Sequence, residues 1–147
     1  MKKVYCVLIL SLPLNCSELD QAYAALKEKK PEQAISFFEQ ALNKEPENQT
    51  ISSELARTQF LCGNYEQAET IYKQQHNQSP ENVQFIFNLA STYNKQSKFP
   101  QATPLLKRTY EKTKNETIKI MLVKNYLRAG AWQDFADLFE INLWWYD

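Results

Sequence analysis

The chain has few of the residues that break helices or carry chemistry. Its 147 residues include two glycines and a single histidine, His76. Because Gly63 and Gly130 stand far apart, the sequence contains no glycine-rich phosphate loop. We expect His76, near the end of a helix, to be a solvated residue without a catalytic or ligand-binding role. We therefore predict that the protein is not an enzyme and holds no metal and no cofactor.

An excess of charge of one sign is also lacking. Seventeen Lys and Arg residues balance seventeen Asp and Glu residues, so the formal net charge is zero. No bulk electrostatic field would hold such a protein on nucleic acid or on an anionic membrane. We therefore expect no nucleic-acid partner, and we predict a protein or peptide partner that is recognised by a local surface.

Long hydrophobic runs are absent except at the start of the chain. Lys2 and Lys3 precede an apolar run over residues 4–14, which is too short to span a bilayer but is typical of a secretory signal. We predict that residues 1–16 are a signal peptide and that the protein is exported, with the periplasm as its destination. A lipid anchor at Cys16 is the less favoured alternative, because the residues before it are not the small ones of a lipoprotein signal. No second apolar stretch follows, so we expect no membrane span in the mature chain.

Cysteine is scarce as well. Removal of residues 1–16 would take away Cys6 and Cys16 and leave only Cys62. One cysteine can form neither an intramolecular disulfide nor a cysteine-based metal site. We expect Cys62 to be a small buried hydrophobic residue in a core that is held by packing alone.

What the sequence does contain is a repeat. Ala34, Ala68 and Ala102 are spaced by thirty-four residues, and so are Pro46 and Pro80. Small and large apolar residues recur three and four places apart within each unit, which predicts two amphipathic helices per unit. Because the connections between them are short, these helices should pack as antiparallel hairpins.

The second unit resembles the tetratricopeptide repeat. That family has a small residue on the first helix, Gly-x-Tyr at the turn, then an alanine, an aromatic residue and a closing proline. The chain has, at these positions, Leu55-Ala56, Gly63, Tyr65, Ala68, Tyr72 and Pro80. The resemblance implies an all-α fold, a right-handed superhelical solenoid of antiparallel helix hairpins. It also implies a domain over residues 17–147 with about 3.5 to 4 repeats, at approximately 17–48, 49–82, 83–115 and 116–147.

Two later units depart from this pattern. In the last unit Phe135 stands where the pattern has alanine, and Ala136 comes one place late, which predicts a final hairpin packed at a shifted angle. In the third unit Pro104 falls early in the second helix and lacks an amide donor. We expect that helix to begin irregularly or to kink.

In the tetratricopeptide family the first helices of successive repeats line a concave groove that binds peptides or partner helices. The register of the repeats implies that the inward positions in this chain are Tyr23, Leu26, Lys27, Arg57, Phe60, Leu61, Phe87, Ser91, Asn94, Lys95, Lys124, Leu127 and Arg128. Every unit contributes a basic residue and none an acidic one, so the groove would suit an acidic peptide or a free C-terminal carboxylate. The alternative is that the apolar members of this set are core residues and that the lysines only keep the helices soluble.

Aromatic residues crowd the end of the sequence, where a solenoid normally has a polar capping helix. Trp144, Trp145 and Tyr146 either fold back over the last hairpin or form a docking surface for another copy or a larger partner. The leading hypothesis is an exported adaptor, or scaffold, that holds a peptide or partner protein in its groove while envelope machinery is assembled. The alternatives are a module that self-associates through its tryptophan-rich end and an accessory subunit of an enzyme complex.

Overall fold

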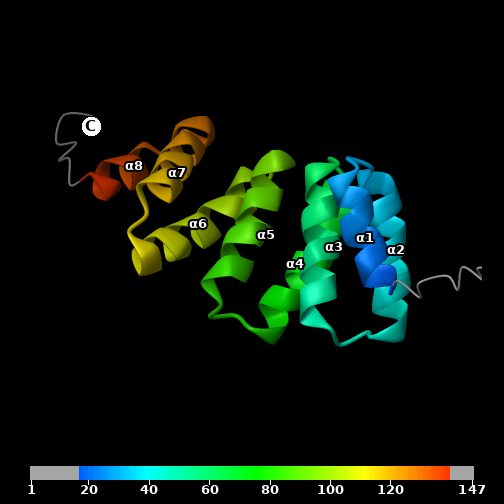
Figure 1. Cartoon of the computed structure of the whole chain (residues 1–147). Helices are drawn as coiled ribbons and strands as arrows, with labels where there is room; N and C mark the ends of the chain where they lie inside the picture. The colour runs from blue at the N-terminus through cyan, green and yellow to red at the C-terminus, as the bar shows by residue number, and fades with distance from the viewer. Residues whose placement is uncertain (1–16, 140–147) are drawn as a thin grey trace, which may run out of the picture.

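The structure, a computed structural model, describes residues 17–139, and in that part of the chain it contains only helices (Figure 1). These are α1 (Glu18–Lys27), α2 (Pro31–Lys44), α3 (Gln49–Leu61), α4 (Tyr65–Gln78), α5 (Val83–Lys95), α6 (Phe99–Thr113), α7 (Glu116–Ala129) and α8 (Trp132–Leu138). The predicted all-α class is confirmed. The signal peptide predicted at residues 1–16 and the aromatic residues Trp144, Trp145 and Tyr146 lie outside the described residues.

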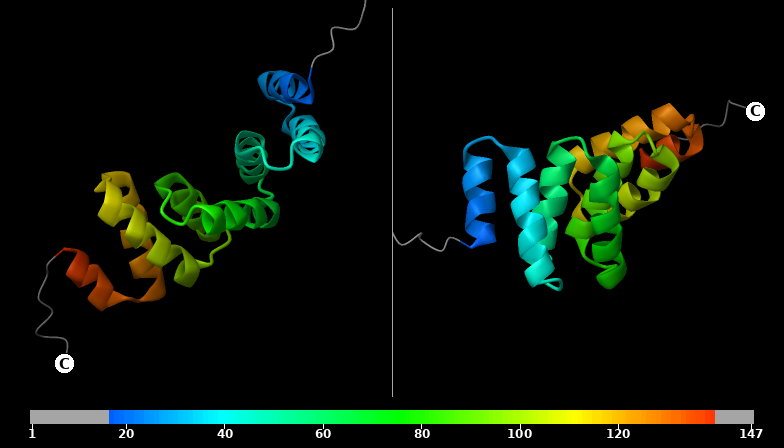
Figure 2. Two further views of the ribbon diagram at one scale, coloured as in Figure 1. Left: turned by 90° about the horizontal axis from the view of Figure 1, so that it is seen from below. Right: turned by 90° about the vertical axis from the view of Figure 1, so that its right-hand side faces the viewer.

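The helices stack in chain order as a solenoid. Each helix packs mainly on the helix before it and the helix after it. The row runs from α1 at one end to α8 at the other, and it curves when it is seen from below (Figure 2). The prediction of a repeat solenoid built from helix hairpins is therefore confirmed. Two helices lie within each of the four predicted repeat ranges.

Asparagine side chains set the starts of three first helices. Asn48, Asn82 and Asn115 precede α3, α5 and α7, and each side-chain oxygen accepts from the backbone N–H groups two and three residues further on. These bonds satisfy donors that have no partner inside the helix, and such a cap contributes about 1 kcal/mol. The three identical caps place the first helices in a common register.

Alanine lets the helices of each hairpin approach closely. Ala34, Ala68, Ala102 and Ala136 lie one on each second helix, and all four are fully buried. A side chain of this size allows two helix backbones to come near each other, and the larger apolar residues then fill the space between hairpins. In α8 the buried alanine comes four residues after the first residue Trp132, whereas in α2, α4 and α6 it comes three residues after the first. The displacement of Ala136 that the sequence indicates is therefore present.

The expected irregular start of α6 is wrong. The helix begins at Phe99, carries Pro100 in its first turn and continues through Pro104 to Thr113 without interruption. Proline fits the first turn of a helix because the amide there has no helical partner. Pro104 takes away the donor for the Pro100 carbonyl, but both residues are exposed, so water can solvate that carbonyl.

Ion pairs tie the second unit to the third. The carboxylate of Glu69 on α4 accepts from Lys73 Nζ at 2.6 Å and from Lys98 Nζ at 2.7 Å. Lys98 directly precedes α6, so the pair joins two hairpins. Gln96 Nε2 adds a bond of 3.1 Å to the backbone oxygen of Tyr65.

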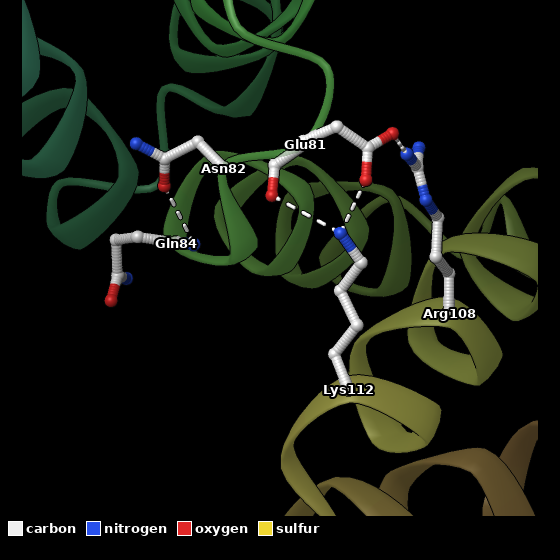
Figure 3. A network of polar contacts seen from close by, with 5 residues as sticks. All are labelled: Glu81, Asn82, Gln84, Arg108 and Lys112. Carbon is white, nitrogen blue, oxygen red and sulfur yellow. Dashed lines mark hydrogen bonds and ion pairs between the residues drawn. The ribbon is translucent and has the colours of Figure 1, made fainter.

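A second polar network joins the loop between α4 and α5 to α6. The carboxylate of Glu81, in the loop before α5, is paired with Arg108 and Lys112 of α6 (Figure 3). Lys112 Nζ also donates to the backbone oxygen of Glu81 at 3.3 Å. Beside it, Asn82 accepts from the backbone of Gln84 at 3.0 Å. The loop that begins the third unit is thus held against that unit's own second helix.

Candidate protein-binding groove

The first helices of the last three units enclose a groove of about 650 Å³. Side chains of α3, α5 and α7 line it, with one further residue from α4. The lining residues are Arg57, Phe60, Leu61, Tyr72, Phe87, Asn88, Ser91, Asn94, Lys95, Met121, Lys124, Asn125 and Arg128. Such a groove is large enough to take an extended segment of another protein.

Seven of the nine residues singled out for binding come together in this groove: Arg57, Phe60, Phe87, Asn94, Lys95, Lys124 and Arg128. Leu61 and Ser91, which the repeat register also placed inward, line it as well. The common caps and the repeat spacing explain this outcome, because equivalent positions on successive first helices face the same way.

The residues of the first unit do not join the groove. Tyr23 and Lys27, also singled out for binding, are exposed on α1 but are not among the lining residues. Tyr23 instead packs edge-on against Phe38, with ring centroids 5.6 Å apart. Leu26 packs against the N-terminal part of the core. The first unit therefore lies outside the groove, which α3, α5 and α7 line, and the binding role of Tyr23 and Lys27 stays a prediction.

The groove is cationic along its lining. Four of its side chains carry a positive charge, and no carboxylate lines it. Lys95 and Lys124 are exposed and form no ion pair with any residue between 17 and 139. The Arg128 guanidinium lies over the ring of Phe99, 5.1 Å from its centroid. Positive charge is therefore concentrated where α5 and α7 meet.

Arg57 differs from the other cations of the groove. Its Nη2 and Nε donate to Glu54 Oε2 at 2.6 Å and 3.1 Å. This carboxylate, one turn earlier on α3, compensates the charge of Arg57 at the α3 side. The repeat pattern was used to predict inward positions only, so it did not identify Glu54 as a partner. A side chain three residues away on the same helix can nevertheless reach Arg57.

Amide and hydroxyl groups form the polar part of the groove. Asn125 on α7 is 1% exposed, and its Nδ2 donates to Asn94 Oδ1 on α5 at 2.7 Å. Asn88 lies on the same face of α5. The Ser91 hydroxyl oxygen is buried and has no hydrogen-bond partner among the described residues. It can therefore bond to a polar group that enters the groove.

An apolar part of the groove lies toward α3. Leu61 is 68% exposed, and Phe60 packs edge-on against Tyr65 with centroids 5.5 Å apart. Tyr72 closes this part from α4, and burial raises the pKa of its hydroxyl to about 12. The hydroxyl is thus neutral near neutral pH. In the sequence Tyr72 is the aromatic residue of the repeat pattern, and the structure makes it part of the groove wall.

Asn88, Met121 and Asn125 line the groove but were not predicted from the sequence. Asn88, Ser91 and Asn94 recur every three residues on α5, so a polar stripe of this kind was a usable signal. Asn125 gave no such signal, because its partner is more than thirty residues away in the sequence.

His76 and Cys62 lie outside the groove, and both differ from expectation. His76 is half-buried, and its Nδ1 is enclosed without a hydrogen-bond partner in the described part of the chain. Burial, helped by the nearby Arg108, lowers the pKa of its imidazole, so it is not the solvated residue that was predicted. Cys62 is half-buried at the end of α3 rather than fully buried, and desolvation raises the pKa of its thiol.

None of the helices described between residues 17 and 139 is long and apolar enough to span a membrane. The same residues contain no group of three His, Cys, Asp or Glu side chains that could hold a metal ion.

Comparison with known proteins relates this fold to one family. Residues 25–85 match the model of the tetratricopeptide repeat. A search among curated protein sequences finds no significant match. Among solved structures, MamA of AMB-1 superposes with a TM-score of 0.74 at 17% identity, over 84% of this chain and 68% of MamA.

Two further structures support the same fold. MamA from Desulfovibrio magneticus RS-1 has a TM-score of 0.73 at 12% identity, over 84% of this chain and 70% of its own. The first tetratricopeptide domain of Spaghetti (RPAP3), solved with the HSP90 peptide SRMEEVD, has a TM-score of 0.67 at 15% identity, over 77% of this chain and 90% of its own. The matched segment shows tetratricopeptide repeats within residues 25–85, and the shared solenoid shows the same fold over most of this chain.

Proposed function

We propose that this protein is an adaptor that holds an acidic peptide segment of a partner protein in the groove between α3, α5 and α7. One observation carries the proposal: the lining includes four cationic side chains and no carboxylate. A cationic surface raises the rate of encounter with acidic segments and disfavours basic ones. The apolar part at Phe60 and Leu61 adds area that a peptide can bury.

The comparisons support a peptide as the ligand. The Spaghetti (RPAP3) domain is solved with the HSP90 peptide SRMEEVD, a sequence with three acidic residues. For the present chain this likeness supports the use of the groove, and the identity of its peptide follows only from the chemistry of its own lining. The lysines and amides of α5 and α7 could bind side-chain carboxylates or a free C-terminal carboxylate.

We propose an adaptor rather than an enzyme, because the groove lining contains no histidine, cysteine, aspartate or glutamate. General acid–base and nucleophilic catalysis depend mainly on these residue types. Tetratricopeptide scaffolds act by binding, and the polar groups in this groove are amides, one serine hydroxyl, one neutral tyrosine hydroxyl and fixed cations.

The proposal is tested with short fluorescent peptides of leucine and glutamate, made with a free or an amidated C terminus, and with their lysine counterparts. Anisotropy measures the affinity of each peptide. We expect the glutamate peptides to bind and the combined change Lys124→Glu and Arg128→Glu to weaken them by about tenfold or more, which corresponds to about 1.4 kcal/mol. The matched control is Lys107→Glu, an exposed lysine of α6 outside the groove.

Three outcomes separate the alternatives. Equal binding of glutamate and lysine peptides would contradict the acidic specificity. Unchanged affinity in the charge-reversed groove would remove the groove as the site. Amidation that abolishes binding would identify the terminal carboxylate, rather than acidic side chains, as the recognised group.

We further propose that the protein is exported to the periplasm and serves the assembly of envelope machinery there. Lys2, Lys3 and the apolar run over residues 4–14 support this proposal. N-terminal sequencing of the protein from fractionated cells tests it. A periplasmic protein that begins after residue 16 is the expected result, a lipid on Cys16 would favour the anchored alternative, and an unprocessed cytoplasmic chain would overturn export.

A further inference from the structure

The cations of the groove fall into two groups that differ in their neighbours. Lys95 on α5 and Lys124 on α7 form no ion pair with any of the described residues. Arg128, also on α7, lies over the ring of Phe99. Arg57 on α3, in contrast, is bonded to a carboxylate of its own helix. The positive charge that a ligand can meet is therefore concentrated on α5 and α7.

Glu54 is the carboxylate that compensates Arg57. Both Nε and Nη2 of Arg57 donate to Glu54 Oε2, at 3.1 Å and 2.6 Å. These two atoms form one edge of the guanidinium, and such an edge can hold a ligand carboxylate through two parallel bonds. Glu54 occupies this edge, and its side chain is only 26% exposed. Its negative charge therefore acts on the groove, although Glu54 is not one of the lining residues.

The ion pair lies beside the apolar part of the groove. Phe60 and Leu61 follow Arg57 by about one turn of α3, so the three side chains share one face of the helix. Tyr72 completes this part from α4. Burial raises the pKa of its hydroxyl to about 12, and the charges of Arg57 and Glu54 shift this pKa in opposite directions because both lie near the phenol. One place in the groove thus combines an ion pair with apolar groups.

Pairing with Glu54 changes which ligand groups are favoured at this place. An apolar side chain that covered an unpaired guanidinium would remove an uncompensated charge from water, which is unfavourable, whereas the paired guanidinium keeps its hydrogen bonds. For a carboxylate the effect is the opposite, since Glu54 repels it and already occupies two N–H groups of Arg57. The α3 side of the groove therefore favours apolar groups, and the α5 and α7 side favours carboxylates.

We propose that Glu54 sets the specificity of the groove: by compensating Arg57 it directs the acidic residues of a bound segment to α5 and α7 and leaves the α3 side to apolar residues. The inference rests on the proposed binding of acidic peptides and adds the pattern of the ligand. That pattern is an acidic part and an apolar part at different places along one segment. Because Glu54 acts through Arg57, it is a positioning residue.

Two kinds of fluorescent peptide of equal length test the proposal by anisotropy. A bipartite peptide has leucines in one half and glutamates in the other, and it is made in both chain orders so that either direction in the groove is represented. A uniform peptide has glutamates throughout. We expect the wild type to bind the better bipartite peptide more tightly than the uniform one. Glu54→Gln keeps the shape and removes the charge, so it should tighten binding of the uniform peptide by about threefold to fivefold and leave the bipartite peptide nearly unchanged.

The matched control is Glu28→Gln, which removes the same charge from an exposed pair outside the groove and should change neither affinity. Glu54→Gln is also made in a chain that already carries Arg57→Gln. Because Glu54 acts through Arg57, it should have no further effect on the preference between the peptides in that chain. Circular dichroism checks that each variant keeps its helix content.

Several results would overturn the proposal. Weaker binding of both peptides by Glu54→Gln would show that Glu54 holds Arg57 in place for a ligand instead of offsetting its charge. An unchanged preference in Glu54→Gln, or the same gain without Arg57, would also contradict it. Equal affinity of the wild type for both kinds of peptide would overturn this inference alone. No binding of any glutamate peptide would overturn the proposed function, and this inference with it.

Discussion

Replacement of Glu69 by glutamine should destabilise the junction between the second and third units. The side chain of Glu69 is 10% exposed and accepts from Lys73 and Lys98. Burial by itself would raise the pKa of this carboxyl, but the hydrogen bonds from Lys73, Lys98 and Gln96 outweigh it and lower the pKa to about 2. Glu69→Gln keeps the shape and removes the charge that these bonds require.

The size of the effect follows from the pKa. The difference between the ordinary value of 4.5 and about 2 corresponds to about 3 kcal/mol at neutral pH. Lys73 and Lys98 are partly solvated, with side chains 51% and 39% exposed, so water screens part of this energy, and we expect a loss of about 2 kcal/mol. The folded pKa is the lower one, so the stabilisation is present above pH 4.5 and disappears as the pH falls toward 2.

Urea unfolding followed by far-ultraviolet circular dichroism, at neutral pH and at several acidic values, measures the change. The control is Glu28→Gln, because the Lys30–Glu28 pair is exposed on both sides and should contribute little. Equal stability of wild type and Glu69→Gln at neutral pH would refute the argument. A deficit that persists unchanged near pH 2 would refute the assignment to the charge.

Two further changes test the packing and the capping of the solenoid. Phe38 is fully buried, so Phe38→Ala should lower the free energy of unfolding by about 3 to 5 kcal/mol, measured by urea unfolding, while the exposed Phe139→Ala should cost much less. Asn82→Ala removes the cap of α5 and should cost about 1 kcal/mol in thermal unfolding. Asn82→Ser should restore most of that loss, and a serine variant as unstable as the alanine one would show that the cap is not the cause.

The repeat pattern was sufficient to predict the elements of the fold and their order. The spacing of Ala34, Ala68 and Ala102 predicted one small buried residue on each second helix, and all three are fully buried. Such a prediction needs only hydrophobic periodicity and turn residues, because both act over short stretches of chain. The same rules misjudged the start of α6, which is regular although Pro104 follows in the helix.

Many of the residues that line the groove could also be predicted from the sequence. Arg57, Lys95, Lys124 and Arg128 could be assigned to one surface because the repeats place equivalent positions on one face. Tyr23 and Lys27 were assigned by the same rule but do not line this groove. The repeat pattern shows which way a residue faces within its own hairpin. Whether that residue lines the groove also depends on the position of the hairpin along the curved stack.

The sequence by itself determined the helices, their pairing into hairpins and the positive character of the inward face, because these follow from spacing along a single helix. Only the tertiary structure decided which charges stay available and which polar groups meet. The bond between Asn94 and Asn125 and the pair between Lys98 and Glu69 join different units. Such contacts depend on the rotation and offset between successive hairpins, and these emerge from packing many side chains together rather than from any local pattern.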